Sequence, residues 1–389
     1  MDDFQVDVAI VGGAAIGSAV ASFLGRLDPK LSVALIEQDP TFRHASTSLS
    51  AASIRQQFST PENIRLSRFG FDFLRSMPEA QGEDAALVTG GYLILAPDGT
   101  EEVAHDLNRV QRAEGAPVIL LDRDALAARF PWLSLDGLAL GSLGTADEGW
   151  FDANALLRAL RKEARDRGVH LVTGAVSGID LADGRVASVR LEDGGTISCG
   201  TLVNAAGPTA GRLAAMAGRP LPVEPRKRSV FVLDCPGGPA PMPLIADPSG
   251  FWLRPEGRRY LTGLSPAAEL DGCCDPIDFE PDHGIFEEQL WPALAARIPA
   301  FETLRVVSAW AGHYDYNVLD QNAVIGRDPE IENFIYANGF SGHGLQQAPG
   351  VGRAVAELIV HGEYRSIDLT RFGYGRVARG EPTPERNVI

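Results

Sequence analysis

The stretch AIVGGAAIGS, from Ala9 to Ser18, decides the fold, because it nearly spells the dinucleotide-binding pattern G-x-G-x-x-G. In that pattern the first glycine permits a tight turn, the second lets the backbone approach a pyrophosphate, and the third lets a helix pack on a strand. Gly12 and Gly17 supply the first and third glycines, but Ala14 stands at the second position. A methyl group is the smallest side chain that can intrude there, and the helix N-terminus still offers N–H groups to phosphates.

The residues around this stretch predict a strand, a turn, a helix and a second strand. Val6–Val11 is a short apolar run, Ala15–Leu24 keeps an apolar face at helical spacing, and Ser32–Ile36 is a second apolar run that ends at Glu37. Such a unit predicts a parallel sheet with a right-handed crossover. Glu37 lies 20 residues after Gly17, where a carboxylate accepts hydrogen bonds from ribose hydroxyls and repels a 2′-phosphate. NADP is therefore disfavoured, whereas FAD and NAD both stay open.

Composition excludes several classes of function. The chain has 389 residues and a formal net charge of −16, which argues against binding nucleic acid or anionic membrane. No run approaches the ~20 apolar residues of a membrane helix, and the first residues lack the features of a secretory signal, so we expect a soluble, cytoplasmic protein. The four cysteines (Cys199, Cys235, Cys273 and Cys274) match neither a disulfide framework nor a zinc site, and no metal is expected.

The length and the change of pattern along the chain predict two interleaved domains. The dinucleotide-type segments are residues 1–84, 146–220 and 318–389. Residues 85–145 and 221–317 form two insertions that read as an antiparallel, β-rich substrate domain. The expected helices are Pro61–Arg75, Glu101–Glu114, Ala153–Arg167 (capped by Asp152), Ile285–Arg297 and one from near Pro349. The expected strands are Leu87–Ala96, Leu202–Gly207, Ser229–Asp234 and Leu304–Tyr316, and Phe251–Gly263 is expected to form a hairpin.

Two later motifs separate FAD from NAD. Together with the Glu37 unit, VNAAGP at 203–208 and GFSGHGLQQAPGVG at 339–352 resemble the D-amino-acid oxidase superfamily of FAD enzymes. The resemblance spans nearly the whole chain and is strongest to the branch of glycine, sarcosine and dimethylglycine oxidases and dehydrogenases. It implies a Rossmann-like α/β FAD-binding domain with an inserted substrate domain. It also implies that a helix N-terminus near SGHG faces the pyrimidine end of the flavin and stabilises the negative charge of the reduced ring.

A further stretch, STSLSAASIRQQFSTPENIRLS at 46–67, is similar to a subgroup that contains a mitochondrial complex I assembly flavoprotein. In the wider family the small residues here, Ser46 to Ser53, wrap the pyrophosphate and flavin, and the following arginine lies near the substrate carboxylate. The resemblance therefore assigns that role to Arg55, whose guanidinium can make paired hydrogen bonds to a carboxylate. A structural ion pair is the alternative.

The resemblance implies a set of residues that contact FAD. They are Gly12, Ala14, Ala15, Ile16, Gly17, Glu37, Gln38, Ser46, Thr47, Ser48, Ala52, Val176, Ala205, Ala206, Gly207, Gly342, His343, Gly344, Leu345 and Gln346.

The chain departs from the sarcosine oxidases at two places. Leu345 and Gln346 stand where those enzymes follow the glycine turn with a carboxylate-binding lysine, so we expect Gln346 to act as a neutral hydrogen-bond partner. Gly312 stands where their cysteine bonds to the flavin, so we expect FAD to be held non-covalently. Tyr314 and His343 complete the expected pocket: the phenol of Tyr314 contacts substrate, and the backbone of His343 lies beside the flavin.

Basic residues also gather in the inserted domain. Arg254 lies on an apolar strand and is expected to bind substrate or a second substrate carboxylate, whereas the other basic groups, Arg226, Lys227, Arg228, Arg258 and Arg259, are expected to face solvent. The six histidines other than His343 show no cluster and are expected on the surface. The oxygen-activating lysine of the family has no counterpart near Arg259 and Tyr260, so oxidase and dehydrogenase both stay open.

These residues predict an FAD enzyme that removes hydride from the carbon beside an amine nitrogen to flavin N5, after which water hydrolyses the imine. The expected substrate is a small secondary amino acid such as an N-substituted glycine, sarcosine-like or iminodiacetate-like, and the expected acceptor is oxygen or an electron-transfer partner. Three alternatives stay open: an FAD-dependent 2-hydroxyacid dehydrogenase, a flavoprotein assembly factor that catalyses nothing, and an NAD enzyme.

Overall fold

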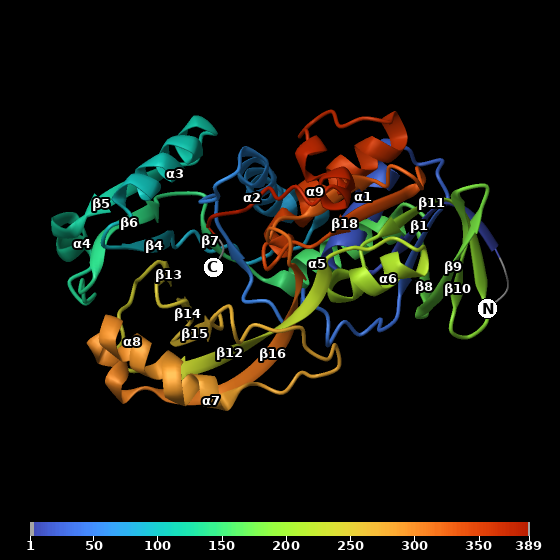
Figure 1. Ribbon diagram of the computed structural model, residues 1–389. Coiled ribbons are helices and arrows are strands. Elements are labelled where there is room, and N and C mark those ends of the chain that lie inside the picture. Colours follow the sequence, from blue (N-terminus) through green and yellow to red (C-terminus); the bar gives the residue numbers. More distant parts are fainter. Residues whose placement is uncertain (1–3, 388–389) are drawn as a thin grey trace.

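The computed structural model describes residues 4–387, which form two large sheets with helices packed around them (Figure 1). The first sheet is mostly parallel, with the spatial order β17-β18-β11-β1-β2-β8 and with β10 and β9 added antiparallel beside β11. Its strands are β1 (Phe4–Val11), β2 (Val33–Glu37), β8 (His170–Thr173), β9 (Val176–Ala182), β10 (Arg185–Leu191), β11 (Thr196–Asn204), β17 (Val324–Arg327) and β18 (Phe334–Asn338).

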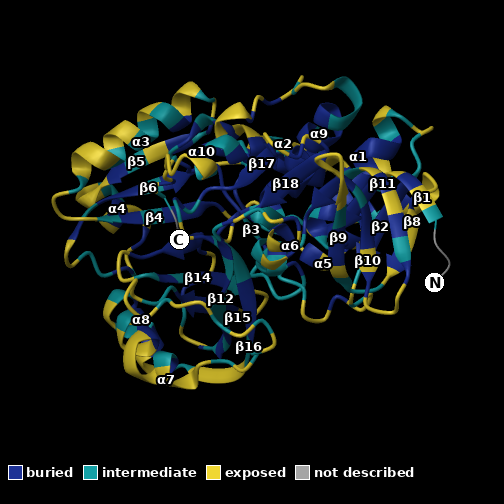
Figure 2. Ribbon diagram, turned by 45° about the vertical axis from the view of Figure 1, so that its right-hand side comes forward, coloured by how far each residue is buried: buried dark blue, intermediate teal, exposed yellow. Residues whose placement is uncertain are grey.

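Helices cover this sheet and bury its apolar strands. They are α1 (Ala15–Leu27), α2 (Pro61–Gln81), α5 (Ala153–Asp166), α6 (Ala210–Met216), α9 (Gly344–His361) and α10 (Tyr374–Ala378). Much of α1 and α9 is dark blue in Figure 2, which marks buried residues. Parallel sheets are typically covered by helices on both faces. At Gly352 of α9 an added Cβ would lie 2.5 Å from the Cβ of Ala19 of α1, so small residues set the close approach of these two helices.

The second sheet is antiparallel except where β13 pairs with β4. Its order is β16-β12-β15-β14-β13-β4-β6-β5. The strands are β4 (Tyr92–Pro97), β5 (Val118–Asp122), β6 (Leu138–Gly144), β12 (Val223–Asp234), β13 (Leu244–Ala246), β14 (Phe251–Glu256), β15 (Arg259–Leu264) and β16 (Arg305–Asn317). In Figure 1 the long ribbon of β12 and β16, at one edge of the second sheet, extends from beside α6 of the first sheet's layer toward α7 and α8.

Helices and short helical turns also surround the second sheet. They are α3 (Glu101–Ala113), α4 (Arg123–Arg129), α7 (His283–Ile285), the π-helical turn η2 (Phe286–Leu290), α8 (Trp291–Arg297) and the 3₁₀ turn η3 (Pro299–Thr303). A small ladder of β3 (Ser53–Ile54) and β7 (Gly149–Trp150) and the 3₁₀ turns η1 (Gly207–Thr209) and η4 (Thr370–Phe372) lie outside these groups. Within residues 4–387 no helix is long and apolar enough to cross a membrane.

Most expected elements are confirmed, with differences at their ends. Asp152 caps α5 through its side chain, which accepts from the N–H groups of Asn154 and Ala155. The strand expected from Leu87 begins only at Tyr92. The helix expected from near Pro349 begins at Gly344, so Pro349 lies inside α9. The helix expected over Ile285–Arg297 is interrupted by the π-helical turn η2.

The strands of the two sheets alternate along the chain in the same order as the predicted domains. Residues 4–37, 170–204 and 324–338 supply the first sheet, and residues 92–144 and 223–317 supply the second. The exact domain boundaries stay a prediction.

Candidate active site

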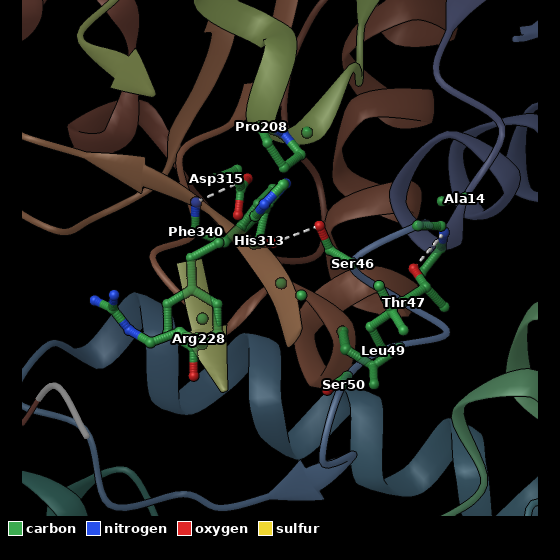
Figure 3. Close-up of a pocket in the computed structure, with 18 of the residues that line it drawn as sticks. Ala14, Ser46, Thr47, Leu49, Ser50, Pro208, Arg228, His313, Asp315 and Phe340 are labelled. Atoms are coloured by element: carbon green, nitrogen blue, oxygen red, sulfur yellow. Dashed lines mark hydrogen bonds between the residues drawn. The ribbon is translucent and has the colours of Figure 1, made fainter. Parts of the chain in front are cut away.

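A cavity of about 370 Å³ is lined by residues of both halves of the molecule (Figure 3). At one end lie the turn between β1 and α1 and the end of β2, and at the other end lie residues of β4, β12, β13 and β16. The segment between β2 and β3 crosses the cavity, and the first turn of α9 closes one side. A cavity at the carboxyl ends of parallel strands is where ligands bind in open α/β sheets.

The glycines of the opening motif fit tightly against neighbouring backbone. Gly12 has a φ of +102°, and an added Cβ there would overlap the carbonyl oxygen of Ala205. An added Cβ at Gly17 would overlap the carbonyl oxygen of Gly12, so Gly17 serves helix packing and does not line the cavity. These two positions therefore exclude any side chain.

Ala14 needs no glycine conformation, because its φ is −75° and its ψ is −157°. Its methyl group lines the cavity at the start of α1. The carboxylate of Glu37 accepts from the N–H of Gly13 at 2.8 Å and from the N–H of Asp39 at 2.9 Å. The bond from Gly13 to the Glu37 carboxylate fixes the turn. The N-terminus of α1 and the Glu37 carboxylate therefore lie together at one end of the cavity.

The segment Ser46–Ser53 is held from both sides. Thr47 Oγ1 accepts from the N–H of Ala15 at 3.2 Å, and Ser46 Oγ donates to the carbonyl of His313 at 2.6 Å (Figure 3). Ala52 has a φ of +52°, which a residue with a side chain adopts only when its surroundings impose it. Ser48 points elsewhere, since its hydroxyl donates to Asn154 and the residue is absent from the cavity wall.

Arg55 lies on the cavity wall with only 2% of its surface exposed. Its Nη1 donates to the carbonyl of Gln57, and its Nη2 donates to the carbonyl of Asn387 and lies 3.3 Å from Nε2 of His343. The guanidinium also stacks on Phe58, at 4.1 Å from the ring centre. Among the residues that the structure describes, no carboxylate forms an ion pair with it, which argues against the alternative of a structural ion pair.

The buried position of Arg55 lowers the pKa of its guanidinium, although an arginine stays charged. Gln346, in the first turn of α9, fixes the backbone of Arg55: its Oε1 accepts from the N–H of Arg55 at 2.7 Å and from Ser67 Oγ at 3.0 Å. Gln346 also lines the cavity. A positive charge without an anionic partner is thus held at the cavity wall by uncharged groups.

The turn before α9 packs against Tyr314 and carries His343. Gly342 has a φ of +99°, and an added Cβ would lie 2.6 Å from the Tyr314 ring, so the turn approaches that ring closely. Burial lowers the pKa of His343 well below its usual value, and the nearby charge of Arg55 lowers it further. The imidazole is therefore neutral.

Asp315 connects this turn to β16. Its Oδ2 accepts from the N–H of Gly339 at 2.9 Å and from the N–H of Phe340 at 3.1 Å (Figure 3). Burial raises the pKa of this carboxyl to about 6, against the effect of the two backbone donors. Asp315 was not among the residues expected in the site, although it directly follows Tyr314 in the sequence.

The basic residues of the inserted half differ from expectation. Arg228 was expected to face solvent, but it lines the cavity, and its guanidinium lies 5.0 Å from the centre of the Tyr314 ring. Both of its Nη atoms donate to the Asp271 carboxylate at 2.7 Å, so its charge is neutralised. Burial alone would lower the pKa of Arg228, but the hydrogen bonds to Asp271 raise it. The side chain of Arg226 is only 12% exposed and is paired with Glu224, which also contradicts that expectation.

Arg254 does not line the cavity. Its Nε donates to the carbonyl of Ala51 at 3.0 Å, its Nη1 pairs with Glu256, and its guanidinium lies beside Trp150. The structure therefore contradicts the expectation that Arg254 binds substrate directly. Val176, at the start of β9, also lies outside the cavity wall.

The other expected cofactor contacts meet in one place. The cavity wall includes Gly12, Ala14, Ala15, Ile16, Glu37, Gln38, Ser46, Thr47, Ala52, Ala205, Ala206, Gly207, Gly342, His343, Gly344, Leu345 and Gln346.

Two features of the site were missed by the sequence analysis. Tyr92, at the start of β4, is buried in the cavity wall, and burial raises the pKa of its phenol. His313 is also buried, so the histidines are not all on the surface: Phe279 stacks between His313, at 4.5 Å, and His44, at 4.3 Å. Only the two glycines before Tyr92 hinted at a close approach; nothing in the sequence linked Phe279 to either histidine.

Comparison with known proteins agrees with this geometry. Residues 7–358 match the family model DAO, FAD dependent oxidoreductase. The chain is 41% identical over 426 aligned positions to FAD-dependent oxidoreductase domain-containing protein 1 of Xenopus laevis, with 99% of this chain and 85% of that protein covered. It is 29% identical to the glycine oxidase of Geobacillus kaustophilus, with 96% and 97% covered. The crystal structure of L-proline dehydrogenase from P. horikoshii superposes with a TM-score of 0.86 at 25% identity, covering 98% and 100% of the two chains.

Proposed function

The chain belongs to the DAO family of FAD-dependent oxidoreductases, and we propose that it oxidises the C–N bond of a small secondary amino acid that carries one carboxylate. FAD supplies the redox chemistry when it is bound, because its isoalloxazine accepts a hydride. The chain's own residues have three tasks: to hold the cofactor, to anchor the substrate carboxylate and to present the C–H bond.

The cavity fits FAD at the nucleotide end. The Gly12 turn leaves room for nothing but backbone, and the start of α1 offers N–H groups to a pyrophosphate. Glu37 is placed to accept from ribose hydroxyls. Leu49 packs against Gly312, where an added Cβ would lie 2.9 Å from its Cβ, and glycine offers no atom for a covalent bond. We therefore propose that FAD is held by non-covalent contacts.

Arg55 is the proposed anchor of the substrate carboxylate, and its unpaired charge is the observation that carries the proposal. A buried guanidinium whose partners are carbonyls and a neutral imidazole binds an incoming carboxylate without first losing an ion pair. The bond between a guanidinium and a carboxylate is charge-assisted and strongest when water is excluded.

The remaining charges favour a substrate with a single carboxylate. Arg228 is neutralised by Asp271, and Arg254 lies outside the cavity wall and is paired with Glu256. A dicarboxylate of the iminodiacetate type would place its second charge near residues that offer no free cation, at a cost in desolvation. We therefore propose sarcosine-like or proline-like amino acids, and the similarity to an L-proline dehydrogenase supports the same class.

The wall of the substrate end is largely apolar. Tyr92, Val230, Leu244, Trp252 and Leu264 come from neighbouring strands of the second sheet and line the same cavity. Such a wall favours the neutral amine, which is also the form that releases a hydride from the adjacent carbon. Water then hydrolyses the imine product.

The test is a substrate screen with purified holoenzyme, in which flavin bleaching is followed without oxygen and peroxide formation is followed with it. We expect bleaching by N-methyl or cyclic amino acids and little by iminodiacetate or 2-hydroxy acids. Peroxide formation then separates an oxidase from a dehydrogenase. Arg55→Lys should raise the KM for the best substrate by roughly 10- to 100-fold, because a lysine cannot reproduce paired hydrogen bonds. Wild-type KM in that variant would refute the anchor.

A further inference from the structure

The segment after α10 is docked beside Arg55, and the carboxylate of Glu385 makes four of its contacts, alongside bonds from Arg386 to Ser59 and from Thr383 to Asp320. Glu385 is 5% exposed, and its Oε1 accepts from the N–H of Ser59 at 2.6 Å and from the N–H of Asn387 at 3.0 Å. Its Oε2 accepts from Thr60 Oγ1 at 3.2 Å and from Asn63 Nδ2 at 2.9 Å.

Glu385 lies at the start of α2 and contacts Ser59, Thr60 and Asn63 there. Thr60 is the N-cap of that helix but makes no side-chain capping bond. A carboxylate at a helix N-terminus gains from the helix dipole, and here it also accepts from the backbone N–H just before the N-cap and from two side chains. Three contacts of the Glu385 carboxylate therefore join this segment to residues more than 320 positions earlier in the chain.

The docked segment reaches Arg55 at two points. The carbonyl of Asn387 accepts from Nη2 of Arg55. Asn387 Nδ2 donates at 2.8 Å to the carbonyl of Gln57, which also accepts from Nη1 of Arg55. Each Nη atom of the guanidinium therefore donates to a carbonyl that Asn387 either supplies or contacts.

From these contacts, and on the basis of the function proposed above, we infer that Glu385 is a positioning residue for the substrate carboxylate. It fastens residues 385–387 to the start of α2, and the fastened backbone fixes the plane of the Arg55 guanidinium. The N–H donors of Arg55 that Gln57, Asn387 and His343 leave free are then held in one orientation on the cavity wall. A guanidinium held in this way loses less conformational freedom when a carboxylate binds than one that is free to turn.

The test measures ligand binding to the holoenzyme by calorimetry, with benzoate as the probe and uncharged benzamide as its isostere. Glu385→Gln keeps one acceptor oxygen, so we expect roughly threefold weaker benzoate binding, and Glu385→Ala removes both acceptors, so we expect roughly tenfold weaker binding. Benzamide affinity, FAD content and kcat should stay near wild type, with the change in turnover confined to KM. Glu381→Gln is the matched control, because Glu381 is 59% exposed on the same segment and pairs only with Arg379 among the described side chains.

Each other outcome overturns the inference. The inference fails if both Glu385 variants bind benzoate as tightly as wild type while Arg55→Lys binds it more weakly. Tighter binding would mean that losing the Glu385 charge, which acts on Arg55, outweighs any loss of positioning. A parallel loss of FAD, benzoate and benzamide would mean a purely structural role. If Arg55→Lys also bound benzoate as tightly as wild type, Arg55 would not be the carboxylate anchor, and the proposed function would fail together with the inference about Glu385. The Arg55→Lys result therefore separates a failure of the inference alone from a failure of the proposed function.

Discussion

Nη2 of Arg55 and Nε2 of His343 lie 3.3 Å apart, in contact distance on the cavity wall. An arginine can only donate, so Nε2 of His343 must be the acceptor and the ring proton must sit on Nδ1. Burial and the charge of Arg55 both lower the pKa of His343. We therefore expect His343 to stay neutral from about pH 6 to about pH 9 and to take no proton during the reaction.

This expectation can be checked by NMR of protein labelled with ¹⁵N-histidine. The His343 signals, assigned from the spectrum of His343→Gln, should report an unprotonated Nε2 across the whole pH range. A titration near the ordinary histidine value would mean that Nε2 of His343 does not accept a hydrogen bond from Arg55.

Affinity for a carboxylate should depend on the charge of Glu148. This residue is fully buried, its Oε1 accepts from the N–H of Gln56 at 2.5 Å, and its Oε2 accepts from Gln57 Nε2 at 2.8 Å. Burial raises its pKa to about 7, and it is one of the carboxylates that act on Arg55. Above pH 7 an ionised Glu148 offsets the charge of Arg55, so benzoate should bind roughly two- to fivefold more weakly at about pH 8.5 than at about pH 5.5.

Glu148→Gln provides the comparison, since its side chain cannot ionise. Asp315, the other carboxyl near the cavity with a raised pKa, titrates in both proteins, so the difference between the two pH profiles isolates Glu148. The variant should show the flatter profile. Identical profiles would mean that Glu148 keeps one charge state in this range. In Glu148→Gln the amide oxygen can still accept from the N–H of Gln56, whereas the amide nitrogen would face Gln57 Nε2, which keeps its bond to the carbonyl of Tyr92 at 2.9 Å; we expect the variant to fold with somewhat lower stability.

The fold and the nucleotide end of the cavity were predictable because their causes are local. Gly12 has a positive φ, Gly17 is required by its contact with the carbonyl of Gly12 in the same turn, and Asp152 caps the helix that directly follows it. Pro349 misled the prediction because proline favours a helix start, whereas the Gly342 turn had already allowed α9 to begin at Gly344. Local signals therefore gave the elements, with errors at their ends.

The substrate end depended on pairings that are distant in sequence. Arg228 and Arg254 both lie on strands, and which of them faces the cavity is decided by the register of β12 with β16 and of β14 with β15. Arg228 lies opposite Gly312, a pairing that no local pattern specifies. The docking of Glu385 beside Thr60 was equally out of reach, because 325 residues separate the two.

Cofactor retention should depend on the size of residue 14. Ala14 has a negative φ, so neither glycine nor valine strains the backbone there, and the difference between variants is steric. Ala14→Gly should bind FAD at least as well as wild type, whereas Ala14→Val should lose most of it, because two added methyl groups enter the space beside the α1 N-terminus. The measurement is the ratio of flavin to protein absorbance after gel filtration. Full flavin content in Ala14→Val would place the phosphates elsewhere.

Stability should depend on pH through Asp315. Its pKa is about 6 in the folded protein and 3.8 is the ordinary value, so the folded state binds more protons between these values. The contribution of this carboxyl to stability is therefore full below about pH 4 and is lost as the pH rises through about 6. Asp315→Asn keeps an acceptor for the N–H groups of Gly339 and Phe340 but carries no charge. Above about pH 7 the variant should therefore have a free energy of unfolding about 1–2 kcal/mol higher than wild type. This gain is smaller than the full pKa shift implies, because Asp315 lines the cavity and is partly solvated there.

Asp315→Ala is the matched control, because it removes the charge together with the acceptor. Two backbone N–H groups of the turn before α9 would lose their partner, at a cost of about 1–3 kcal/mol each if they stay buried. We therefore expect opposite shifts of Tm at about pH 8: upward for the asparagine variant and downward for the alanine variant. Both variants should lack the wild-type loss of Tm between about pH 4 and about pH 6. If Asp315→Asn were destabilised at that pH as much as Asp315→Ala, the charge rather than the acceptor would hold the turn, and the raised pKa of Asp315 would be wrong.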